Sequence, residues 1–335
     1  MMIREQLEKW EQEYLSPYAT LSMNSKGRER IEEQCDIRPV FQRDRDRILH
    51  CKSFRRLKDK TQVFLTPKGD HYRTRLTHTL EVSQNARTIA KALRLNEDLV
   101  EAIALGHDLG HTPFGHAGER ALARVCPLGF KHSEQSVRTV EILEKNGMGL
   151  NLTWEVRDGI RNHQTEGMPA TLEGKIVRFS DKIAYIHHDM DDAIRAGILM
   201  ESDVPKEIGE VIGFTTGERL DHFIHDLVTN SYGRDDIQMS PPVAEAMRKL
   251  RQFMFERVYT NPEAKSEEGK AEMLVERLYE YYTRHLELLP REFLWRMEEK
   301  GEQKERIVCD YVGAMTDRFA IAKYEEIFIP HSWHG

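Results

Sequence analysis

Histidine-aspartate dipeptides are the part of this sequence best suited to chemistry, because imidazole nitrogens and carboxylate oxygens both bind metal ions. Three such dipeptides occur along the chain: His107-Asp108, His188-Asp189 and His225-Asp226. The first follows the apolar stretch VEAIAL and a glycine, which predicts a helix that opens into a glycine-rich loop. The third lies in the amphipathic segment RLDHFIHDLV, which favours a position on the surface or at the edge of the core. The context therefore favours His107-Asp108 as the candidate site.

Two further residues can complete a metal site around this dipeptide. His78 begins a helical segment in RTRLTHTLEV, and Asp181 lies in the helical stretch FSDKIAYIHHDM. Two imidazoles and two carboxylates suit Mg²⁺, Mn²⁺, Fe²⁺ or Ni²⁺ with water ligands better than a closed tetrahedral zinc site. Taken singly, each residue is better explained as a solvated or hydrogen-bonded polar group. The four together favour one divalent ion with open positions for water or phosphate oxygen.

The helix expected over residues 172–197 has two distinct faces. At steps of three and four, one face carries the apolar side chains Ile176, Phe179, Ile183 and Ile186. The other carries the polar side chains Asp181, Tyr185, His188, Asp189 and Asp192. A buried helix seldom presents such a polar stripe unless it faces a metal, a cation or a polar ligand.

The elements that position these residues are predicted to be helices, so the fold class is all-α. Apolar residues recur at helical spacing in six segments, 79–95, 97–105, 134–146, 172–197, 272–288 and 305–324. Asn96 is the expected N-cap of the second segment. Strand signals are scarce, the longest lies at 62–65, and they allow a short hairpin near 61–75. Loops are expected at 108–119 and at 260–270.

Composition describes a water-soluble chain with a modest core. Hydrophobic residues make up 39% and charged residues 31% of the 335 positions, and the formal net charge of −7 argues against wholesale nucleic-acid binding. The four cysteines are widely spaced, which favours reduced thiols over a zinc-thiolate site. No apolar run is long enough to span a membrane. The N-terminus is charged from its fourth residue, so we expect no signal peptide and a cytoplasmic protein.

The order His78, His107-Asp108, Asp181 resembles the H…HD…D signature of HD-domain phosphohydrolases. The longer string HDLGHTPFGHAGE (107–119) resembles the deoxyguanosine triphosphate triphosphohydrolase branch, which also includes the human SAM-and-HD-domain dNTPase. Flanking segments agree, among them ILHCKSFRRLKDKTQVF, HSEQSVR and FSDKIAYIHHD, and the match runs from about residue 17 to about 190. Within the branch, the chain is most similar to the shorter bacterial proteins. This resemblance implies an HD core at about 74–190 and a C-terminal helical region at about 200–335, within a single unit of 335 residues.

The resemblance also implies roles for the matching residues. The metal ligands would be His78, His107, Asp108 and Asp181. His116 and Glu119 would form a catalytic pair beside the α-phosphate, with His111 in the same pocket. A carboxylate can orient and charge an imidazole, which then protonates the departing 5′ oxygen. Residues near the substrate would be Gln62, Arg75, His132, Lys182, Tyr185 and Asp189. The alternative for His111 and His116 is a pair of solvated loop histidines.

The basic run at 43–60 has two interpretations. Its arginines and lysines can contact phosphate, an effector nucleotide or single-stranded DNA, or they can pair with nearby acids. Pairing is slightly favoured for Arg43, Arg45 and Arg47, and phosphate contact for Arg56 and Lys58.

The activity implied by the resemblance is metal-dependent hydrolysis of deoxynucleoside triphosphates to deoxynucleoside and triphosphate. Homo-oligomers, either tetramers or hexamers, and activation by a dNTP at a separate site are further expectations from the resemblance. Two alternatives stay open: another HD reaction, such as that of a nucleotidase or phosphodiesterase, and a non-catalytic sensor of dNTPs or single-stranded DNA. The HTPFGHAGE extension and the intact His116 and Glu119 favour the triphosphohydrolase.

Overall fold

A computed structural model describes residues 2–62, 73–259 and 267–330. These residues pack into two compact units, each assembled from three separated stretches of the chain. The first unit comprises residues 1–50, 77–107 and 150–264, and the second comprises 51–76, 108–149 and 265–335. The HD core expected at 74–190 contributes residues to both units.

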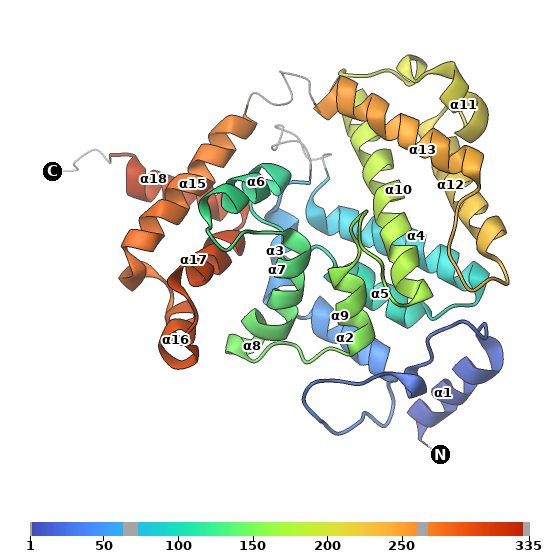
Figure 1. The fold of residues 1–335 in the computed structure, drawn as a ribbon, viewed down its shortest axis with the longest axis horizontal. Coiled ribbons are helices and arrows are strands. Elements are labelled where there is room, and N and C mark those ends of the chain that lie inside the picture. Colours follow the sequence, from blue (N-terminus) through green and yellow to red (C-terminus); the bar gives the residue numbers. More distant parts are fainter. Residues whose placement is uncertain (1, 63–72, 260–266, 331–335) are drawn as a thin grey trace. The chain divides into compact units, whose positions relative to one another are not determined.

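The first unit is built from helices, several of which pack against α10 (Figure 1). Its helices are α1 (Ile3–Tyr14), α2 (Val40–Leu49), α4 (Arg75–Leu93, from Thr77 onward), α5 (Glu97–Gly106), α9 (Trp154–Arg161), α10 (Leu172–Arg195), α11 (Lys206–Ile212), α12 (Thr216–Ser231) and α13 (Pro241–Met254). Short 3-10 turns lie at Ser22–Asn24 and Glu201–Asp203, and a π-turn at Phe255–Tyr259 extends α13. Helix α10 contacts α5, α9, α12 and α13, which places it at the centre of this unit.

Buried acids tie the loops of the first unit to its helices. Asp44 is fully buried. It accepts hydrogen bonds from the backbone and hydroxyl of Thr153 and forms an ion pair with Arg28. Glu173 in the first turn of α10 accepts from the backbone of Thr20 at 2.9 Å and of Asn96 at 3.1 Å. These carboxylates satisfy backbone donors that burial would otherwise leave without partners.

The second unit packs α6 (Gly115–Val125) against the long helix α15 (Glu268–Arg284), and α15 against α17 and α18 (Figure 1). Its other helices are α3 (Lys52–Arg56), α7 (His132–Arg138), α8 (Glu144–Gly147), α16 (Arg291–Lys300), α17 (Lys304–Gly313) and α18 (Asp317–Phe328). Turns of 3-10 or π type lie at Leu57–Asp59, Thr139–Leu143 and Leu286–Leu288. One core cluster joins α6 to the C-terminal helices, with Leu122, Val275 and Val308 fully buried.

The all-α prediction is confirmed: no strand forms in residues 2–62, 73–259 and 267–330. Asn96 is the N-cap of α5 and accepts from the Leu99 backbone at 3.2 Å. Of the expected hairpin, Thr61 and Thr74 form one antiparallel bridge, whereas residues 63–72 lie outside the described residues.

Two predicted helices are interrupted. The segment 134–146 ends in a left-handed turn at Lys145 and Asn146, after a π-turn. The segment 305–324 breaks after Gly313, because Thr316 caps a new helix, α18, through a hydrogen bond from the Phe319 backbone. The loop expected over 108–119 is also shorter than predicted, since α6 begins at Gly115. Of the loop expected at 260–270, residues 260–266 lie outside the described part, and α15 begins at Glu268.

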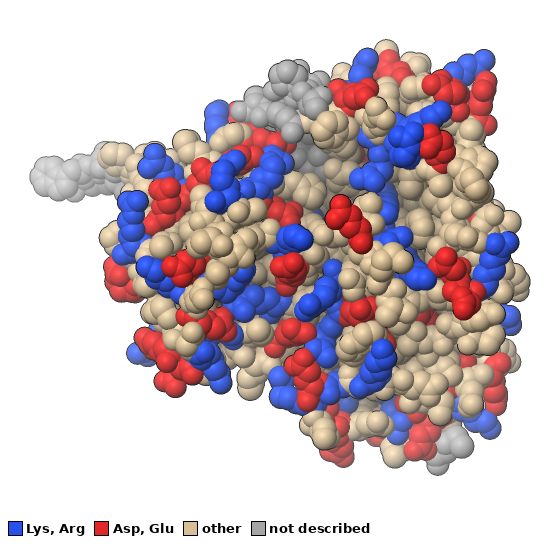
Figure 2. All heavy atoms as spheres, in the orientation of Figure 1, with Lys and Arg blue, Asp and Glu red and all other residues tan. Residues whose placement is uncertain are grey.

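Basic and acidic side chains are interspersed on the face shown in Figure 2, in keeping with a chain of 49 basic and 56 acidic residues. No helix in the described residues is long and apolar enough to cross a membrane.

Candidate active site

Three of the four predicted metal ligands lie together in the first unit. The Nε2 atoms of His78 and His107 both face Asp181 Oδ1, at 3.1 and 3.7 Å. His78 comes from α4, His107 from the C-terminal end of α5, and Asp181 from α10, so three helices each supply one group. Both imidazoles are almost fully buried. The fourth ligand, Asp108, follows His107 directly in the chain, and the boundary between the two units falls at this peptide bond.

Hydrogen bonds on the opposite ring nitrogens orient both imidazoles. His107 Nδ1 donates to the Ala104 carbonyl at 2.6 Å, which leaves Nε2 as the basic nitrogen toward Asp181. His78 Nδ1 lies 3.2 Å from His188 Nδ1, and His188 Nε2 contacts the carboxylate of Glu81. Metal-ligating histidines commonly hold their second nitrogen in this way, because the partner fixes both tautomer and ring orientation.

The donor set fits a divalent metal ion. Burial acts to raise the pKa of Asp181, but the hydrogen bond from His78 and the electrostatic attraction of His107 hold that pKa well below its usual range. Its oxygen is therefore an ionised ligand between two imidazoles, a set that matches cations such as Mg²⁺, Mn²⁺, Fe²⁺ or Ni²⁺.

The polar stripe on α10 continues beyond Asp181. Asp189 is buried and accepts a hydrogen bond from the Tyr259 hydroxyl, whose ring lies 5.7 Å from that of Tyr185. Lys182, half-buried on the same helix, has its pKa lowered to about 8 by burial and by the nearby charges of Arg178 and Arg251.

A cavity of about 370 Å³ lies beside Tyr185 in the first unit, with Arg248, Arg251 and Tyr259 in its wall. Arg251 and Tyr259 were not among the predicted site residues, because they come from α13 and the turn after it, far from the HD signature. The only sequence signal for them is weak: an arginine in an amphipathic helix and a tyrosine eight positions later, in the turn that follows it.

The predicted catalytic residues His111, His116 and Glu119 lie in the second unit, where Glu119 contacts both His116 and the predicted substrate-binding residue His132. Glu119, on the first turns of α6, lies 3.3 Å from His116 Nδ1 and 2.9 Å from His132 Nδ1. Burial alone would raise the pKa of Glu119, but the hydrogen bonds from His116 and His132 hold it well below its usual range. His111 stacks on His132 at 4.2 Å and is fully buried, and burial together with nearby Arg75 lowers its pKa well below its usual value. His111 is therefore neutral, whereas Glu119 can stabilise a charged His116 or His132.

His116 is half exposed and His111 is buried, so only His116 partly matches the alternative of two solvated loop histidines. His116 nevertheless lies on α6 beside its carboxylate rather than in a loop. The atoms of Asp108, His111 and His132 lie within 4.8 Å of one another, so this second unit also presents a His/Asp cluster able to hold a cation.

Three buried polar atoms of predicted substrate-binding or catalytic residues in the second unit have no hydrogen-bond partner among the described residues. They are Gln62 Oε1, Arg75 Nε and His111 Nδ1. The other end of the Arg75 guanidinium is occupied, because Nη1 pairs with Asp108 Oδ2 at 2.7 Å and Nη2 donates to the Gln62 carbonyl. A buried polar atom without a partner costs about 1–3 kcal/mol, so such atoms commonly await a ligand or water.

Two backbone features shape the segment that follows the HD dipeptide. A Cβ atom on Gly110 would lie 2.1 Å from the Ser136 nitrogen, so only glycine allows α7 to approach this closely. Phe114 adopts a left-handed conformation with φ of 61°, and its N–H donates to Asp317 at 2.9 Å. Non-glycine residues in this region store strain that commonly accompanies functional sites.

The three arginines at the start of the basic run form ion pairs in the structure. Arg43 and Arg47 pair with Glu32, and Arg45 pairs with Asp46, Asp98 and Glu101, so the pairing interpretation is confirmed for these three. The nearby Asp44 pairs with Arg28 instead.

Of the three His-Asp dipeptides, His225-Asp226 lies at the surface. The His225 side chain is 76% exposed, as the sequence suggested.

Lys60 joins the segment after the HD dipeptide to the C-terminal helices. Its fully buried ammonium donates to the carbonyls of His111 and Gly313, and burial, reinforced by the charge of Arg56, lowers its pKa to about 7. The lysine pKa in an unfolded chain is about 10.4. Between these two values the unfolded state binds more protons, so the contribution of Lys60 to stability rises with pH.

We therefore expect the difference in unfolding free energy between the wild-type protein and Lys60→Met to change with pH. Raising the pH from about 7 to about 10 should stabilise the wild-type protein relative to the variant, as measured by urea unfolding at several pH values. Lys58→Met is the matched control, because the Lys58 side chain is 67% exposed and should give no such slope. A pH-independent difference for Lys60→Met would show that the buried ammonium is not titrating.

Comparisons with known families and structures agree with this geometry. The HD domain model matches residues 75–186, and the phosphohydrolase-associated domain model matches residues 237–326. Among solved structures, a phosphohydrolase from Bacteroides thetaiotaomicron is similar in fold, with a TM-score of 0.52 at 19% identity over 84% of this chain and 67% of the other. The two family models define the class as an HD-domain phosphohydrolase, and the solved structure is similar in fold alone.

Relatives along nearly the whole chain are more specific. A deoxyguanosinetriphosphate triphosphohydrolase-like protein of Caldanaerobacter subterraneus subsp. tengcongensis is 57% identical over 99% of this chain and 98% of its own length. A protein of the same description from Clostridium perfringens strain 13 is 50% identical over 98% of each chain. The chain belongs to the deoxyguanosinetriphosphate triphosphohydrolase-like family of HD-domain proteins.

Proposed function

We propose that this protein is a metal-dependent hydrolase of deoxynucleoside triphosphates that releases deoxynucleoside and intact triphosphate. The observation that carries this proposal is the set of buried atoms without partners at Gln62, Arg75 and His111, because the family resemblance independently assigns these residues to the substrate pocket. An acceptor at Gln62 Oε1 suits a deoxyribose 3′ hydroxyl, and a donor at Arg75 Nε suits a phosphate oxygen.

The metal ligands in this proposal are His78, His107, Asp108 and Asp181. His78, His107 and Asp181 converge within the first unit, and Asp108 adjoins His107 along the chain. A divalent ion bound to these residues would polarise the α-phosphate and lower the pKa of a bound water.

Residues of the chain would then manage the leaving group and its charge. Water oxygen forms a bond to the α-phosphorus while the bond from phosphorus to O5′ breaks, and O5′ takes its proton from His116. A proton from the attacking water restores His116 at the end of the cycle. Because Glu119 engages His116 Nδ1, Nε2 is the nitrogen that would protonate O5′, and the carboxylate stabilises the charged imidazole before transfer. Arg75 would stabilise negative charge on the phosphates.

The stripe on α10 would contribute to substrate binding, as the family resemblance implies. Tyr185 against the sugar could reject a 2′ hydroxyl, and Asp189, held by Tyr259, could accept a hydrogen bond from the sugar. Lys182 would neutralise phosphate charge, and Arg251 in the adjoining cavity is a further cation for the same task. We also propose that the enzyme is cytoplasmic and forms a homo-oligomer, as the family resemblance implies.

Product analysis tests the reaction. The purified protein is incubated with each of the four dNTPs, singly and mixed, with Mn²⁺ or Mg²⁺, and the products are separated by ion-exchange chromatography. Deoxynucleoside plus intact triphosphate supports the proposal, and a requirement for the mixture would support an activating dNTP site. Orthophosphate or pyrophosphate would favour another HD reaction. Nucleotide binding without turnover under any metal would favour a sensor.

A further inference from the structure

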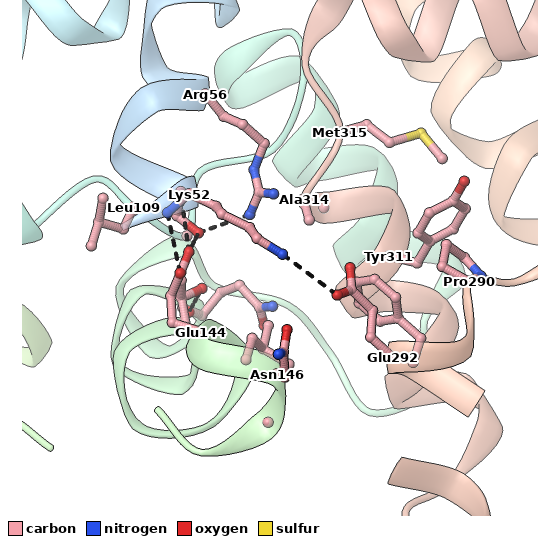
Figure 3. A pocket seen from close by; sticks show the side chains of 18 of the residues that line it. Lys52, Arg56, Leu109, Glu144, Asn146, Pro290, Glu292, Tyr311, Ala314 and Met315 are labelled. Atoms are coloured by element: carbon pink, nitrogen blue, oxygen red, sulfur yellow. Dashed lines mark hydrogen bonds and ion pairs between the residues drawn. The ribbon is translucent and has the colours of Figure 1, made fainter. Parts of the chain in front are cut away.

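A separate cavity of about 350 Å³ lies within the second unit (Figure 3). Helix α3 and the α8 turn form one side, and α16, the end of α17 and the start of α18 form the other. Leu109 and Gly110 contribute to its wall, whereas His111, His116, Glu119 and His132 do not line it. The cavity is therefore distinct from the cluster formed by these four side chains.

Arg56 is a cation in this cavity whose guanidinium has few hydrogen-bond partners among the described residues. Its guanidinium projects toward the hollow in Figure 3 and makes one hydrogen bond to the described residues, from Nη2 to Ser53 Oγ at 2.8 Å. No carboxylate of the described residues lies within ion-pairing distance of it. Burial lowers the pKa of Arg56, which indicates a charge that has lost much of its hydration. An anion in the cavity would restore partners to this forked donor.

Arg296, on the opposite side, is a second incompletely satisfied guanidinium. Its side chain is about 95% buried and pairs with Glu302 through Nη2, while Nε has no hydrogen-bond partner among the described residues. Two arginines with unused donors thus line the same hollow.

The two acidic side chains of the cavity wall are already engaged. Glu144 accepts hydrogen bonds from the Ser53 hydroxyl at 2.6 Å and from the Ser53 and Lys52 backbones at 2.7 and 3.2 Å. Glu292 lies 3.8 Å from Lys52 Nζ, as Figure 3 shows. The cationic side chains Lys52, Arg56, Lys145 and Arg296 outnumber these acids, so the cavity favours an anion of low charge.

The rest of the wall combines apolar and aromatic side chains with the polar side chains of Ser53, Gln135, Thr139, Asn146 and Thr316. The apolar and aromatic part carries the argument for a ring. It includes Phe293, Tyr311, Met315, Phe319 and Pro290. The Tyr311 ring packs edge-on against Phe293 at 5.3 Å, which fixes both rings. Flat ring systems bind such walls by stacking and by contact with the methionine sulfur.

We propose that this cavity binds a small amphipathic organic anion that combines one flat ring system with one carboxylate or phosphate group. The anionic group lies at Arg56 and the ring against Phe293 and Tyr311. A cavity of this size that combines apolar and aromatic walls with charged groups is typical of small-molecule sites. A triphosphate is a poor fit, because its several charges would meet Glu144 and Glu292. This site does not depend on the proposed triphosphohydrolase activity.

Isothermal titration of the full-length, metal-free protein tests the proposal. The probes are indole-3-acetate (ring plus carboxylate), deoxyguanosine monophosphate (ring plus phosphate), indole alone and inorganic phosphate alone. We expect at least one of the two ring-plus-anion probes to bind at least tenfold more tightly than either fragment. The better of the two identifies which anionic group the site prefers.

Two variants localise that binding. Arg56→Gln removes the unused cation and should weaken binding tenfold or more, since a hydrogen bond to a charged group contributes about 1.5–3 kcal/mol. Ala314→Leu adds bulk at a cavity-lining position and should weaken binding by at least the same factor. Arg284→Gln, an exposed position at the end of α15, is the charge-matched control and should leave affinity unchanged.

Circular dichroism establishes that each variant is folded. If Arg56→Gln unfolds, the affinity of Ala314→Leu alone tests whether the probe binds in this cavity. The proposal is overturned if neither ring-plus-anion probe binds saturably below about 10 mM. It is equally overturned if binding survives in folded Arg56→Gln and Ala314→Leu, because the probe would then occupy another site. If the product analysis shows no dNTP hydrolysis, the interpretation of these binding results does not change.

Discussion

Asp181→Ala should lose the bound divalent metal and at least about 10³-fold of kcat, a loss of at least about 4 kcal/mol in transition-state stabilisation. Asp181 Oδ1 is the oxygen on which His78 and His107 converge, so its removal leaves two imidazoles without the ionised ligand between them. The metal content per chain, measured by inductively coupled plasma mass spectrometry after dialysis, gives a readout independent of turnover.

Asp191→Ala is the matched control for this experiment. Asp191 lies on the same helix, but its side chain is 34% exposed and pairs with Arg195, away from the metal ligands. Its alanine variant should retain both metal and activity. If Asp181→Ala kept a full complement of metal, the assignment of Asp181 as a ligand would be wrong.

His116→Ala should retain the metal and lose about 10²–10⁴-fold of kcat, the usual contribution of a positioned general acid. The imidazole is half exposed and contacts Glu119, so its removal should disturb little packing. A kcat that falls while metal content and thermal stability stay unchanged would separate a chemical role from a structural one.

His225→Ala serves as the control for His116→Ala. It removes an exposed imidazole from another His-Asp dipeptide, and we expect wild-type turnover. Wild-type turnover in His116→Ala itself would exclude His116 as the acid and would direct attention to His132, which shares Glu119.

The helical part of the site could be predicted because local sequence and packing agree there. Helices α5 and α10 have clear apolar faces, and Asn96 caps α5 through a short-range hydrogen bond. The polar stripe of α10 indicated in advance that Asp181, His188 and Asp189 would face a polar site. His188 does contact His78, a pairing across 110 residues that periodicity alone could not specify.

Features that depend on distant contacts could not be predicted from the sequence. The break before α18 is stabilised by Asp317, which accepts from Thr61 and from the Phe114 backbone, more than 200 residues away in both cases. Tyr259 reaches Asp189 from the far end of α13, and nothing in the local sequence marks either partner. The sharing of Glu119 by two histidines likewise follows from tertiary packing.

The most direct test of the proposed chemistry is hydrolysis of dGTP in water enriched in ¹⁸O, with mass spectrometry of both products. Water attack on the α-phosphorus predicts one ¹⁸O atom in the triphosphate and none in the deoxyguanosine. Label in the deoxyguanosine 5′ hydroxyl would instead mean attack at carbon, and it would contradict a mechanism in which His116 protonates a departing O5′.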